Sequence, residues 1–334
     1  MKISLLIASG DDDYTEHLSG VLSERYKDAF YVSVCRSSQN LRELLAVSGF
    51  DAALLEPPLA NGIDLSPVRL PVMLWDDSAS GTGVQQEELV IRKYQRISSI
   101  AAYILEYYAK ISADEFDPGA GRAYITAVWS PAGGVGKTTV AVAQALKQSS
   151  AGKNVVYLNM EHFSSSPAYF DDDGRSISSV FEMLEKNTGN LKMLIQAIIR
   201  KDADSGIHYF RGPENYDDVN ILSEEDASAL LTACAGVTEE LVVDLPSSCD
   251  VRTRQVFRLA DRVLLVTDQS SASAAKLRQF VSQHSVFEQF KSKLVLVANK
   301  GSAYSDHEFA EAISLPLAQS ADPATVSKAL SSRI

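Results

Sequence analysis

Seven consecutive residues near the middle of the chain combine three glycines with a lysine and two threonines. Glycine lets the backbone approach a phosphate closely, and the N–H groups at a helix N-terminus present partial positive charge to it. A lysine adds a full charge at the β- and γ-phosphates, and the threonine after it can ligate Mg²⁺. The residues are Gly133, Gly134, Val135, Gly136, Lys137, Thr138 and Thr139. Their order predicts a nucleotide-binding P-loop, in which Thr138 is a ligand of Mg²⁺.

The flanking sequence supplies the two elements that a P-loop needs. An apolar run rich in β-forming residues, Tyr124–Trp129, precedes the glycines, and an alanine-rich segment with helical spacing, Thr139–Gln148, follows them. A glycine turn before a helix can arise by chance. The order of strand, glycine loop, Lys-Thr and helix is far more specific, and it favours the P-loop interpretation.

A second metal ligand is predicted at Asp244. It lies in the apolar run Leu241–Leu245, and the following Pro246 cannot continue a strand. A carboxylate at the end of a buried strand holds Mg²⁺ through water in P-loop enzymes. We therefore expect Asp244 and Thr138 to share one Mg²⁺.

The composition excludes several classes of function. The chain has 334 residues, enough for two domains with separate cores, and a net charge of -12. That charge argues against a broad surface for DNA or RNA. The three cysteines, Cys35, Cys234 and Cys249, are far apart, so the sequence predicts neither a disulfide framework nor a CxxC metal site. The five histidines are equally scattered, which argues against a zinc site.

The beginning of the chain bears on its location. The first apolar run, Ile3–Ala8, is too short for a signal peptide, and acidic residues follow it closely. No stretch approaches the length of a membrane span. We expect the protein in the cytoplasm.

Residues 1–111 alternate strand and helix patterns. Helical patterns cover Tyr14–Tyr26, Leu41–Val47 and Ile97–Lys110. Short apolar strands interleaved with helices predict a parallel sheet that is covered on both faces. The strand candidates are Ile3–Ala8, Phe30–Val34, Ala52–Leu55, Val72–Trp75 and Leu89–Ile91.

This layout resembles a response-regulator receiver domain, which has a flavodoxin-like α/β fold. A receiver accepts phosphate on an aspartate at the end of its third strand, where this chain has Glu56. Ser9 and Gly10 stand where acidic residues would hold Mg²⁺. Lys93 matches the lysine of the family, and Tyr94 replaces the usual proline. Glu56 either mimics a permanently charged state or simply caps a strand end, and both interpretations predict a pseudo-receiver that serves contacts rather than signalling.

The rest of the chain predicts a linker and a second α/β domain. Residues 112–122 are rich in proline, glycine and acidic residues, which is typical of a linker. In residues 123–334 the alternation predicts a doubly wound, mostly parallel sheet, whose ligands bind at the carboxyl ends of the strands. The later strand candidates are Asn154–Asn159, Leu241–Leu245, Arg262–Thr267 and Leu294–Asn299. The helix candidates are Ile177–Lys186, Leu191–Arg200, Glu224–Ala235, Arg254–Ala260 and Ala272–Val281.

The tight spacing of GGVGKTT, with the DLP sequence at Asp244, resembles the deviant P-loop of the ParA/MinD family of dimerising ATPases. The resemblance implies a homodimer, with ATP and Mg²⁺ as cofactors. Members of that family carry a lysine just before the first glycine, and this lysine reaches the nucleotide of the partner subunit. Here that position is Ala132, so the cross-dimer lysine is missing.

Two further strand exits match the pattern of the family in part. Where the family has two aspartates spaced by one residue, this chain has Asn159 and Glu161. The resemblance implies that Glu161 is the catalytic residue that orients the attacking water, while Asn159 weakens the metal site. Asn299 matches the adenine-binding asparagine of the family. Ser302 stands where GTP-specific proteins have an aspartate, which favours ATP over GTP. Taken alone, both exits could be ordinary polar strand ends.

The order of the two domains resembles the TadZ/CpaE family. Members of that family help to place the Tad/Flp pilus assembly machinery at particular sites in bacterial cells. The resemblance implies an ATP-dependent dimerising localisation protein with weak or absent ATP hydrolysis. It also implies a partner in the pilus machinery or a polar marker protein, and concentration at a cell pole.

Two alternative functions belong to the same superfamily. A ParA-like partitioning ATPase on DNA needs basic surface and the lysine that Ala132 replaces. A MinD-like membrane ATPase needs a C-terminal amphipathic helix, and Val326, Leu330 and Ile334 do share one helical face. Because that segment is short, we favour packing on the domain over membrane insertion.

Overall fold

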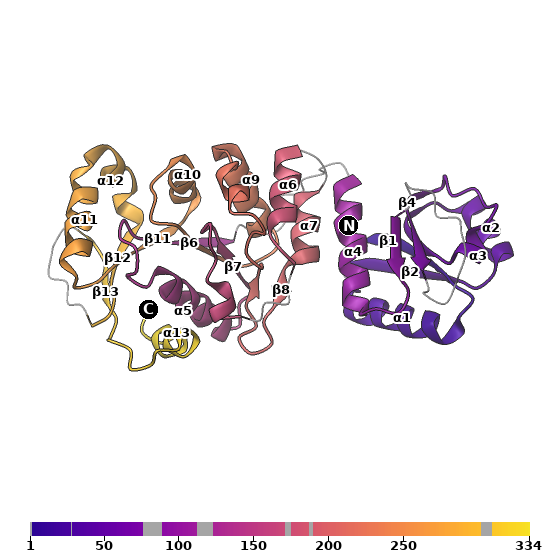
Figure 1. The fold of residues 1–334 in the computed structure, drawn as a ribbon, viewed down its shortest axis with the longest axis horizontal. Helices are drawn as coiled ribbons and strands as arrows, with labels where there is room; N and C mark the ends of the chain where they lie inside the picture. The colour runs from indigo at the N-terminus through magenta and orange to yellow at the C-terminus, as the bar shows by residue number, and fades with distance from the viewer. Residues whose placement is uncertain are drawn as a thin grey trace. The chain divides into compact units, whose positions relative to one another are not determined.

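The computed structural model describes residues 2–27, 29–75, 89–111, 123–170, 175–186, 190–301 and 309–334. The chain divides into two compact units, Met1–Ser112 and Ala113–Ile334. The predicted linker, residues 112–122, lies outside the described residues. Each unit is an α/β structure with its own sheet, as the alternating pattern predicts (Figure 1).

The described part of the first unit contains a five-stranded sheet. Its order is β2-β1-β3-β4-β5, and neighbouring strands are parallel. This is the strand order of flavodoxin-like folds. The strands are β1 (Ile3–Ala8), β2 (Phe30–Cys35), β3 (Phe50–Leu55), β4 (Val68–Trp75) and β5 (Leu89–Arg92). The helices are α1 (Asp12–Arg25), α2 (Ser38–Val47), α3 (Pro57–Ala60) and α4 (Ile97–Ile111).

Local signals explain where the first helices begin. The side chain of Asp11 accepts a hydrogen bond from the backbone N–H of Tyr14, and Ser37 does the same for Asn40. Such caps satisfy N–H groups that have no partner within the helix. Since β1 and β3 are central strands, their side chains are buried on both faces, which is why they appear as continuous apolar runs.

The described part of the second unit contains an eight-stranded sheet with the order β13-β12-β11-β6-β10-β7-β9-β8. All neighbours are parallel except β8 and β9 at one edge. The strands are β6 (Tyr124–Trp129), β7 (Val155–Asn159), β8 (Arg200–Lys201), β9 (His208–Tyr209), β10 (Glu240–Asp244), β11 (Arg262–Thr267), β12 (Leu294–Ala298) and β13 (Ala312–Ser314). The mostly parallel sheet of this unit is the doubly wound architecture that the sequence predicts.

Helices cover both faces of this second sheet. Figure 1 shows α5 and α13 on one face, and α9 and α10 on the other. The helices are α5 (Lys137–Ser150), α6 (Ser178–Lys186), α7 (Leu191–Ile198), α8 (Asp217–Asn220), α9 (Glu224–Ala235), α10 (Val251–Leu259), α11 (Ser271–Ser282), α12 (His284–Phe290) and α13 (Pro323–Ser331). Two short 3₁₀ helices are Ser166–Ala168 and Lys291–Lys293.

Some boundaries differ from the sequence prediction. The helix predicted to reach Arg200 ends at Ile198, because Ile199 is extended and Arg200 begins β8. Helix α10 begins three residues earlier than predicted, since the side chain of Asp250 caps it at the N–H of Thr253, 3.0 Å away. The edge strands β8 and β13, and β9 beside β8, have only two or three residues, too few for a recognisable period.

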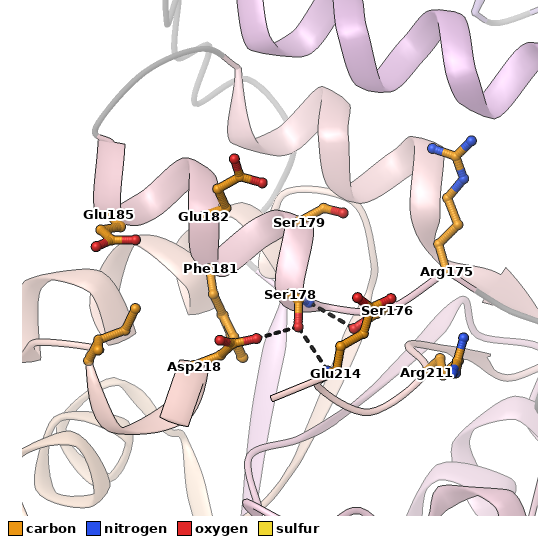
Figure 2. A pocket seen from close by; sticks show the side chains of 11 residues that line it. Arg175, Ser176, Ser178, Ser179, Phe181, Glu182, Glu185, Arg211, Glu214 and Asp218 are labelled. Carbon is orange, nitrogen blue, oxygen red and sulfur yellow. Dashed lines mark hydrogen bonds between the residues drawn. The ribbon is translucent and has the colours of Figure 1, made fainter. Parts of the chain in front are cut away.

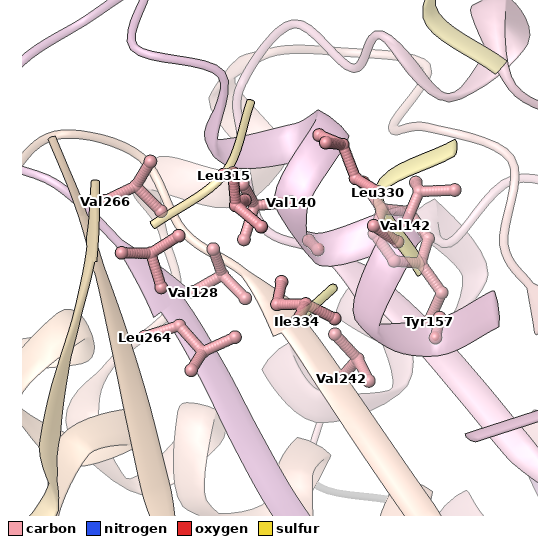
Figure 3. Close-up of a cluster of buried hydrophobic side chains, with 14 of the residues drawn as sticks. Val128, Val140, Val142, Tyr157, Val242, Leu264, Val266, Leu315, Leu330 and Ile334 are labelled. Atoms are coloured by element: carbon pink, nitrogen blue, oxygen red, sulfur yellow. The ribbon is translucent and has the colours of Figure 1, made fainter. Parts of the chain in front are cut away.

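Helix α13 packs on α5 and completes the core on that face of the sheet. Figure 3 shows Leu330 and Ile334 among the apolar side chains of α5 and the central strands. Both are buried, and Val326 packs against the same cluster. The hydroxyl of Ser327 donates to the backbone carbonyl of Thr139 at 3.1 Å. The apolar face of α13 is therefore occupied by the domain itself, as the packing interpretation predicts.

No helix in the described ranges is both long and apolar enough to cross a lipid bilayer.

Candidate nucleotide-binding site

The P-loop connects β6 to α5 and takes a shape that depends on glycine. Gly134 and Gly136 have φ values of +75° and +92°. L-amino acids rarely adopt this left-handed region, whereas glycine enters it without a steric cost. Gly136 is also the residue before the first turn of α5, and its carbonyl accepts from Val140 at 3.0 Å. The N–H groups at the end of the loop therefore lie at the N-terminus of α5, where the helix dipole is positive.

Two residues that follow β12 hold the loop by hydrogen bonds to its backbone carbonyls. The Nδ2 atom of Asn299 donates to the carbonyl of Val135 at 2.9 Å, and the Nζ atom of Lys300 donates to the carbonyl of Gly134 at 2.6 Å. Lys300 also pairs with Asp268 at 3.2 Å. The predicted contact of Asn299 with adenine stays a prediction; the structure places its amide on the loop. Ser302, on which the preference for ATP was argued, lies outside the described residues.

Lys137 is buried at the floor of the loop. Its Nζ atom lies 3.0 Å from Oγ of Ser247 and 3.4 Å from Oε1 of Glu161. The structure thus brings together the predicted phosphate-binding lysine and the predicted catalytic glutamate. Ser247 was not predicted, because a serine in a loop carries no pattern. Its position three residues after Asp244 is the one signal that could have suggested it.

Asp244 lies beneath the loop and is fully buried. Its Oδ2 atom accepts from the hydroxyl of Tyr157 at 2.9 Å and from the Nδ2 atom of Asn159 at 3.4 Å. Nδ2 of Asn159 also donates to the Tyr157 hydroxyl at 3.1 Å. The other carboxylate oxygen, Oδ1, has no hydrogen-bond partner within the described residues. A buried oxygen without a donor is a position that a cation can occupy.

The surroundings of Asp244 favour its protonated form. Burial raises the pKa of this carboxyl to about 7, and the negative charge of Glu161 acts in the same direction. The hydroxyls of Thr138 and Tyr157 and the ammonium of Lys137 oppose the rise in pKa without cancelling it. A divalent cation at Oδ1 would supply the missing positive charge, and the predicted ligands Asp244 and Thr138 therefore fit Mg²⁺.

A tyrosine that the sequence analysis missed contacts the end of the loop. The Tyr169 hydroxyl and the Thr139 hydroxyl lie 2.9 Å apart. Burial raises the pKa of the Tyr169 hydroxyl, so this group remains a neutral hydrogen-bonding partner at physiological pH. Thr139 is therefore held by Tyr169 through its side chain and by Ser327 through its backbone.

The sheet explains why residues so far apart in sequence meet here. Strands β6 and β7 lie on either side of β10, all three parallel, and Asp244 pairs in register with Val128 and Asn159. Their carboxyl ends therefore open at one edge, where P-loop and strand-end residues converge. The described residues contain no separate cluster of three or more histidine, cysteine or acidic side chains that could hold a metal. The candidate site combines Gly133, Gly134, Val135, Gly136, Lys137, Thr138, Thr139, Glu161, Asp244 and Asn299.

The receiver-like positions of the first unit form a separate, closed network. Glu56 pairs with Lys93 at 2.6 Å and accepts from the Ser9 hydroxyl at 2.7 Å and the Gly10 N–H at 2.8 Å. Burial alone raises the pKa of Glu56, but these partners outweigh it and hold the pKa below its usual range. Glu56 makes no side-chain capping bond to α3. Its carboxylate is instead saturated by contacts within the unit. The predicted pseudo-receiver role stays a prediction.

Comparison with known proteins identifies the architecture of the second unit. No protein-family model matches the chain. A curated relative, the septum site-determining protein MinD of Helicobacter pylori, is 26% identical over 213 residues, covering 58% of this chain and 76% of that protein. The crystal structure of a ParA family ATPase from Chlorobium tepidum superposes with a TM-score of 0.52 at 16% identity, covering 63% of this chain and 92% of that structure. The sheet with its P-loop therefore has the ParA/MinD-type ATPase fold.

The left-handed turn at Gly136 generates a first prediction. A Cβ atom there would lie 2.5 Å from Nδ2 of Asn299, and the φ of +92° is unfavourable for alanine. Gly136→Ala should lower the free energy of unfolding by about 1–3 kcal/mol, measured by urea unfolding. Gly133→Ala is the matched control, since no atom lies within 4 Å of its Cβ position. Equal stability of the two variants would contradict this account of the loop.

A second prediction follows from the raised pKa of Asp244. The value of about 7 in the folded protein exceeds the ordinary value of 3.8, so between these pH values the folded state holds a proton that the unfolded state has lost. Stability from this group is therefore lost as pH rises from about 4 to about 7. Without Mg²⁺, Asp244→Asn should be more stable than wild type at pH 8, by on the order of 4 kcal/mol. This difference should shrink towards pH 4.

The measurement is urea unfolding with EDTA at several pH values, and the quantity of interest is the difference between variant and wild type. Carboxylates that do not interact with Asp244 cancel in that difference. Asp204→Asn, at an exposed aspartate, is the control and should show no such trend. A wild-type-to-variant difference that is independent of pH would show that Asp244 does not titrate in this range.

Proposed function

We propose that the second unit binds ATP with Mg²⁺, dimerises in its presence, and hydrolyses it slowly or not at all. The observation that carries this proposal is Oδ1 of buried Asp244, which has no hydrogen-bond partner in the described ranges and lies next to a preformed P-loop that contains Lys137. Loop and lysine supply positive charge for the phosphates, and Asp244 with Thr138 supplies oxygen ligands for the metal. Mg²⁺ in such sites neutralises charge that develops on the phosphate oxygens.

Each residue of the site has a proposed role. Lys137 exchanges its contacts with Glu161 and Ser247 for the β- and γ-phosphates of the nucleotide. Glu161 is then free to accept a hydrogen bond from the attacking water, which it orients towards the γ-phosphate. Asn299 contributes to the preference for adenine. The backbone N–H groups of Gly133–Thr139 surround the phosphates.

Two residues explain the proposed slow hydrolysis. Ala132 is buried, and its N–H donates to the hydroxyl of Ser130 at 3.0 Å. Because its side chain is a methyl group, this position contributes no cation. Asn159 donates a hydrogen bond to Asp244 where the family resemblance implies a carboxylate. Since phosphoryl transfer depends on positioning and charge stabilisation, these changes lower the rate while leaving nucleotide binding in place.

The cellular role is proposed from the order of the two units. A receiver-like unit followed by an ATPase unit supports a TadZ/CpaE-like protein that positions Tad/Flp pilus assembly machinery. In this role the protein forms a homodimer in the cytoplasm and binds pilus machinery or a polar marker protein, and it concentrates at a cell pole. The first unit serves contacts, because Glu56 is held by Lys93 and two further donors.

A MinD-like membrane ATPase is the alternative that the curated relative favours. The buried face of α13 counts against it, since Leu330 and Ile334 lie in the core. A ParA-like role on DNA is disfavoured by the net charge of -12. Sedimentation with anionic liposomes and with DNA, each with and without ATP, distinguishes these roles from the proposed one.

Nucleotide binding is the third prediction. ATP with Mg²⁺ should raise the melting temperature by linkage, equivalent to about 2.7 kcal/mol at a hundredfold excess over Kd, and GTP should do so less. Lys137→Ala should remove most of the shift caused by ATP, whereas Lys328→Ala on exposed α13 surface should keep it. Comparing shifts, rather than melting temperatures, separates binding from any change in stability. Equal stabilisation by ATP and GTP would refute the base assignment.

Turnover is the fourth prediction. Light scattering should show that ATP shifts the wild-type protein towards a dimer, while phosphate release stays near background. Ala132→Lys with Asn159→Asp should raise turnover, because a cation at the γ-phosphate can be worth roughly 10³–10⁵ in rate. Adding Lys137→Ala to that variant should abolish the gain. Rapid hydrolysis by the unmodified protein would mean that another residue replaces the missing lysine.

A further inference from the structure

Several exposed apolar side chains of the second unit lie on segments that contact one another. In its described residues the large apolar side chains that are exposed are Tyr124, Phe163, Tyr216, Ile221, Val251 and Leu317. Four of these six come from three neighbouring segments, and we call them the apolar patch: Phe163, Tyr216, Ile221 and Val251. Phe163 is 81% exposed, which is unusual for the side chain of a soluble domain.

Direct contacts tie two of these segments together. The rings of Phe163 and Tyr216 are stacked, with centroids 6.0 Å apart and an angle of 25° between the planes. Beside them, Nε2 of His162 and Oδ1 of Asn220 lie 2.8 Å apart. The loop after β7 is therefore held against α8. The two aromatic rings therefore form one stacked pair rather than two independent side chains.

The third segment is the start of α10. The guanidinium of Arg252 donates to the carbonyl of Val219 in α8, which joins the start of α10, where Val251 lies, to α8. Ile221 follows α8 directly. The same guanidinium pairs with Asp250 at 2.7 Å, so its charge is already neutralised. The start of α10 thus adds Val251 to the patch, and the guanidinium of its second arginine, Arg254, donates to the backbone carbonyl of Cys249 at 3.1 Å.

Acidic side chains border the patch. A cavity of about 500 Å³ lies between α6 and residues 211–221, and Ile221 lines it. Figure 2 shows Glu182 and Glu185 of α6 and the facing Asp218 around one end of it, and Glu182 pairs with Lys186 at 2.6 Å. The arginines of this cavity, Arg175 and Arg211, lie towards its other end (Figure 2).

Further carboxylates extend this acidic border along the segment that carries Tyr216. Glu214 and Asp217 are exposed on either side of that tyrosine. Asp218 accepts from the hydroxyl of Ser178 at 2.5 Å, which fixes the segment against α6. The surface therefore combines a stacked aromatic pair with carboxylates at its border.

We propose that the apolar patch and its acidic border bind a basic amphipathic segment of another protein. Apolar side chains on one face of such a segment would cover Phe163 and Tyr216, and flanking lysines and arginines would meet the carboxylates. Opposite charges around a small apolar centre favour encounter and exclude acidic partners. This inference depends on the surface alone and does not require that the P-loop binds ATP.

The charges also argue against two other occupants. In a symmetric dimer whose two-fold axis passes through this patch, the acidic border of one copy would lie close to the acidic border of the second copy, and the like charges would repel. An anionic lipid surface would be repelled for the same reason. A positively charged protein segment is the occupant that the border selects.

The test uses a phage-displayed library of random 16-residue peptides, panned against the full-length protein. Enriched peptides are synthesised and their affinity is measured by fluorescence anisotropy. We expect peptides with net positive charge and apolar residues at i, i+3 or i+4 spacing. Their affinity should fall at least about tenfold for the double variant Phe163→Ser with Tyr216→Ser, as for the loss of a central aromatic contact.

Matched variants separate local effects from general ones. Leu317→Ser removes an exposed apolar side chain outside the patch and should leave the affinity unchanged. Glu214→Lys with Asp217→Lys should weaken binding at least about tenfold and reduce its salt dependence. Glu16→Lys with Glu24→Lys changes the net charge equally on exposed positions of α1 and should not weaken binding.

Three results would overturn the proposal. Enriched peptides could lack basic residues, or they could bind the Phe163→Ser and Tyr216→Ser variant as tightly as wild type. The patch variant could instead change the oligomeric mass measured by light scattering, which would assign the patch to a second copy of the chain. Circular dichroism and the melting temperature of each variant verify that a loss of affinity is not a loss of fold.

Discussion

Burial of unlike charges at one edge of a parallel sheet is the constraint on which the second unit depends. Lys137, Glu161 and Asp244 come from three different segments, and the parallel order of β6, β10 and β7 delivers all of them to the same end of the sheet. Isolated charges there would be costly, so each is given a partner. Ser247 and Tyr157 supply neutral hydrogen bonds. Among the described residues Oδ1 of Asp244 has no hydrogen-bond partner, which leaves this oxygen available to a cation.

The sequence was informative where a residue type has one physical use. Glycines before Lys-Thr predicted the loop, and an aspartate after an apolar run predicted the buried carboxylate. Contacts that join distant segments could not be predicted, such as those of Asn299 with Val135 and Tyr169 with Thr139. These depend on which strands lie side by side, and a single sequence shows no such pairing. Short edge strands such as β8 were not predicted, because two residues are too few to show an alternating pattern.

In the first unit, too, the sequence pattern predicted the elements but not the contacts between their side chains. Its alternating runs predicted the helices and parallel strands, and the position of Glu56 at a strand end was evident from the chain. The sequence could not show that Lys93, Ser9 and Gly10 would converge on that one carboxylate. A carboxylate held by three donors of its own unit keeps these neighbours in place, and this favours a single arrangement of the strand ends.

The hydrogen bonds from Asn299 and Lys300 to the P-loop affect the rate at which a ligand associates. Lys300 itself adopts a φ of +57°, a conformation that a lysine keeps only when its surroundings enforce it. With the carbonyls of Gly134 and Val135 already tied to β12, the loop has its final shape before any ligand arrives. Ordering a free loop would cost about 1–2 kcal/mol for each residue, and folding has already met that cost here. The site is preorganised, so the rate of association should reflect diffusion and charge rather than loop closure.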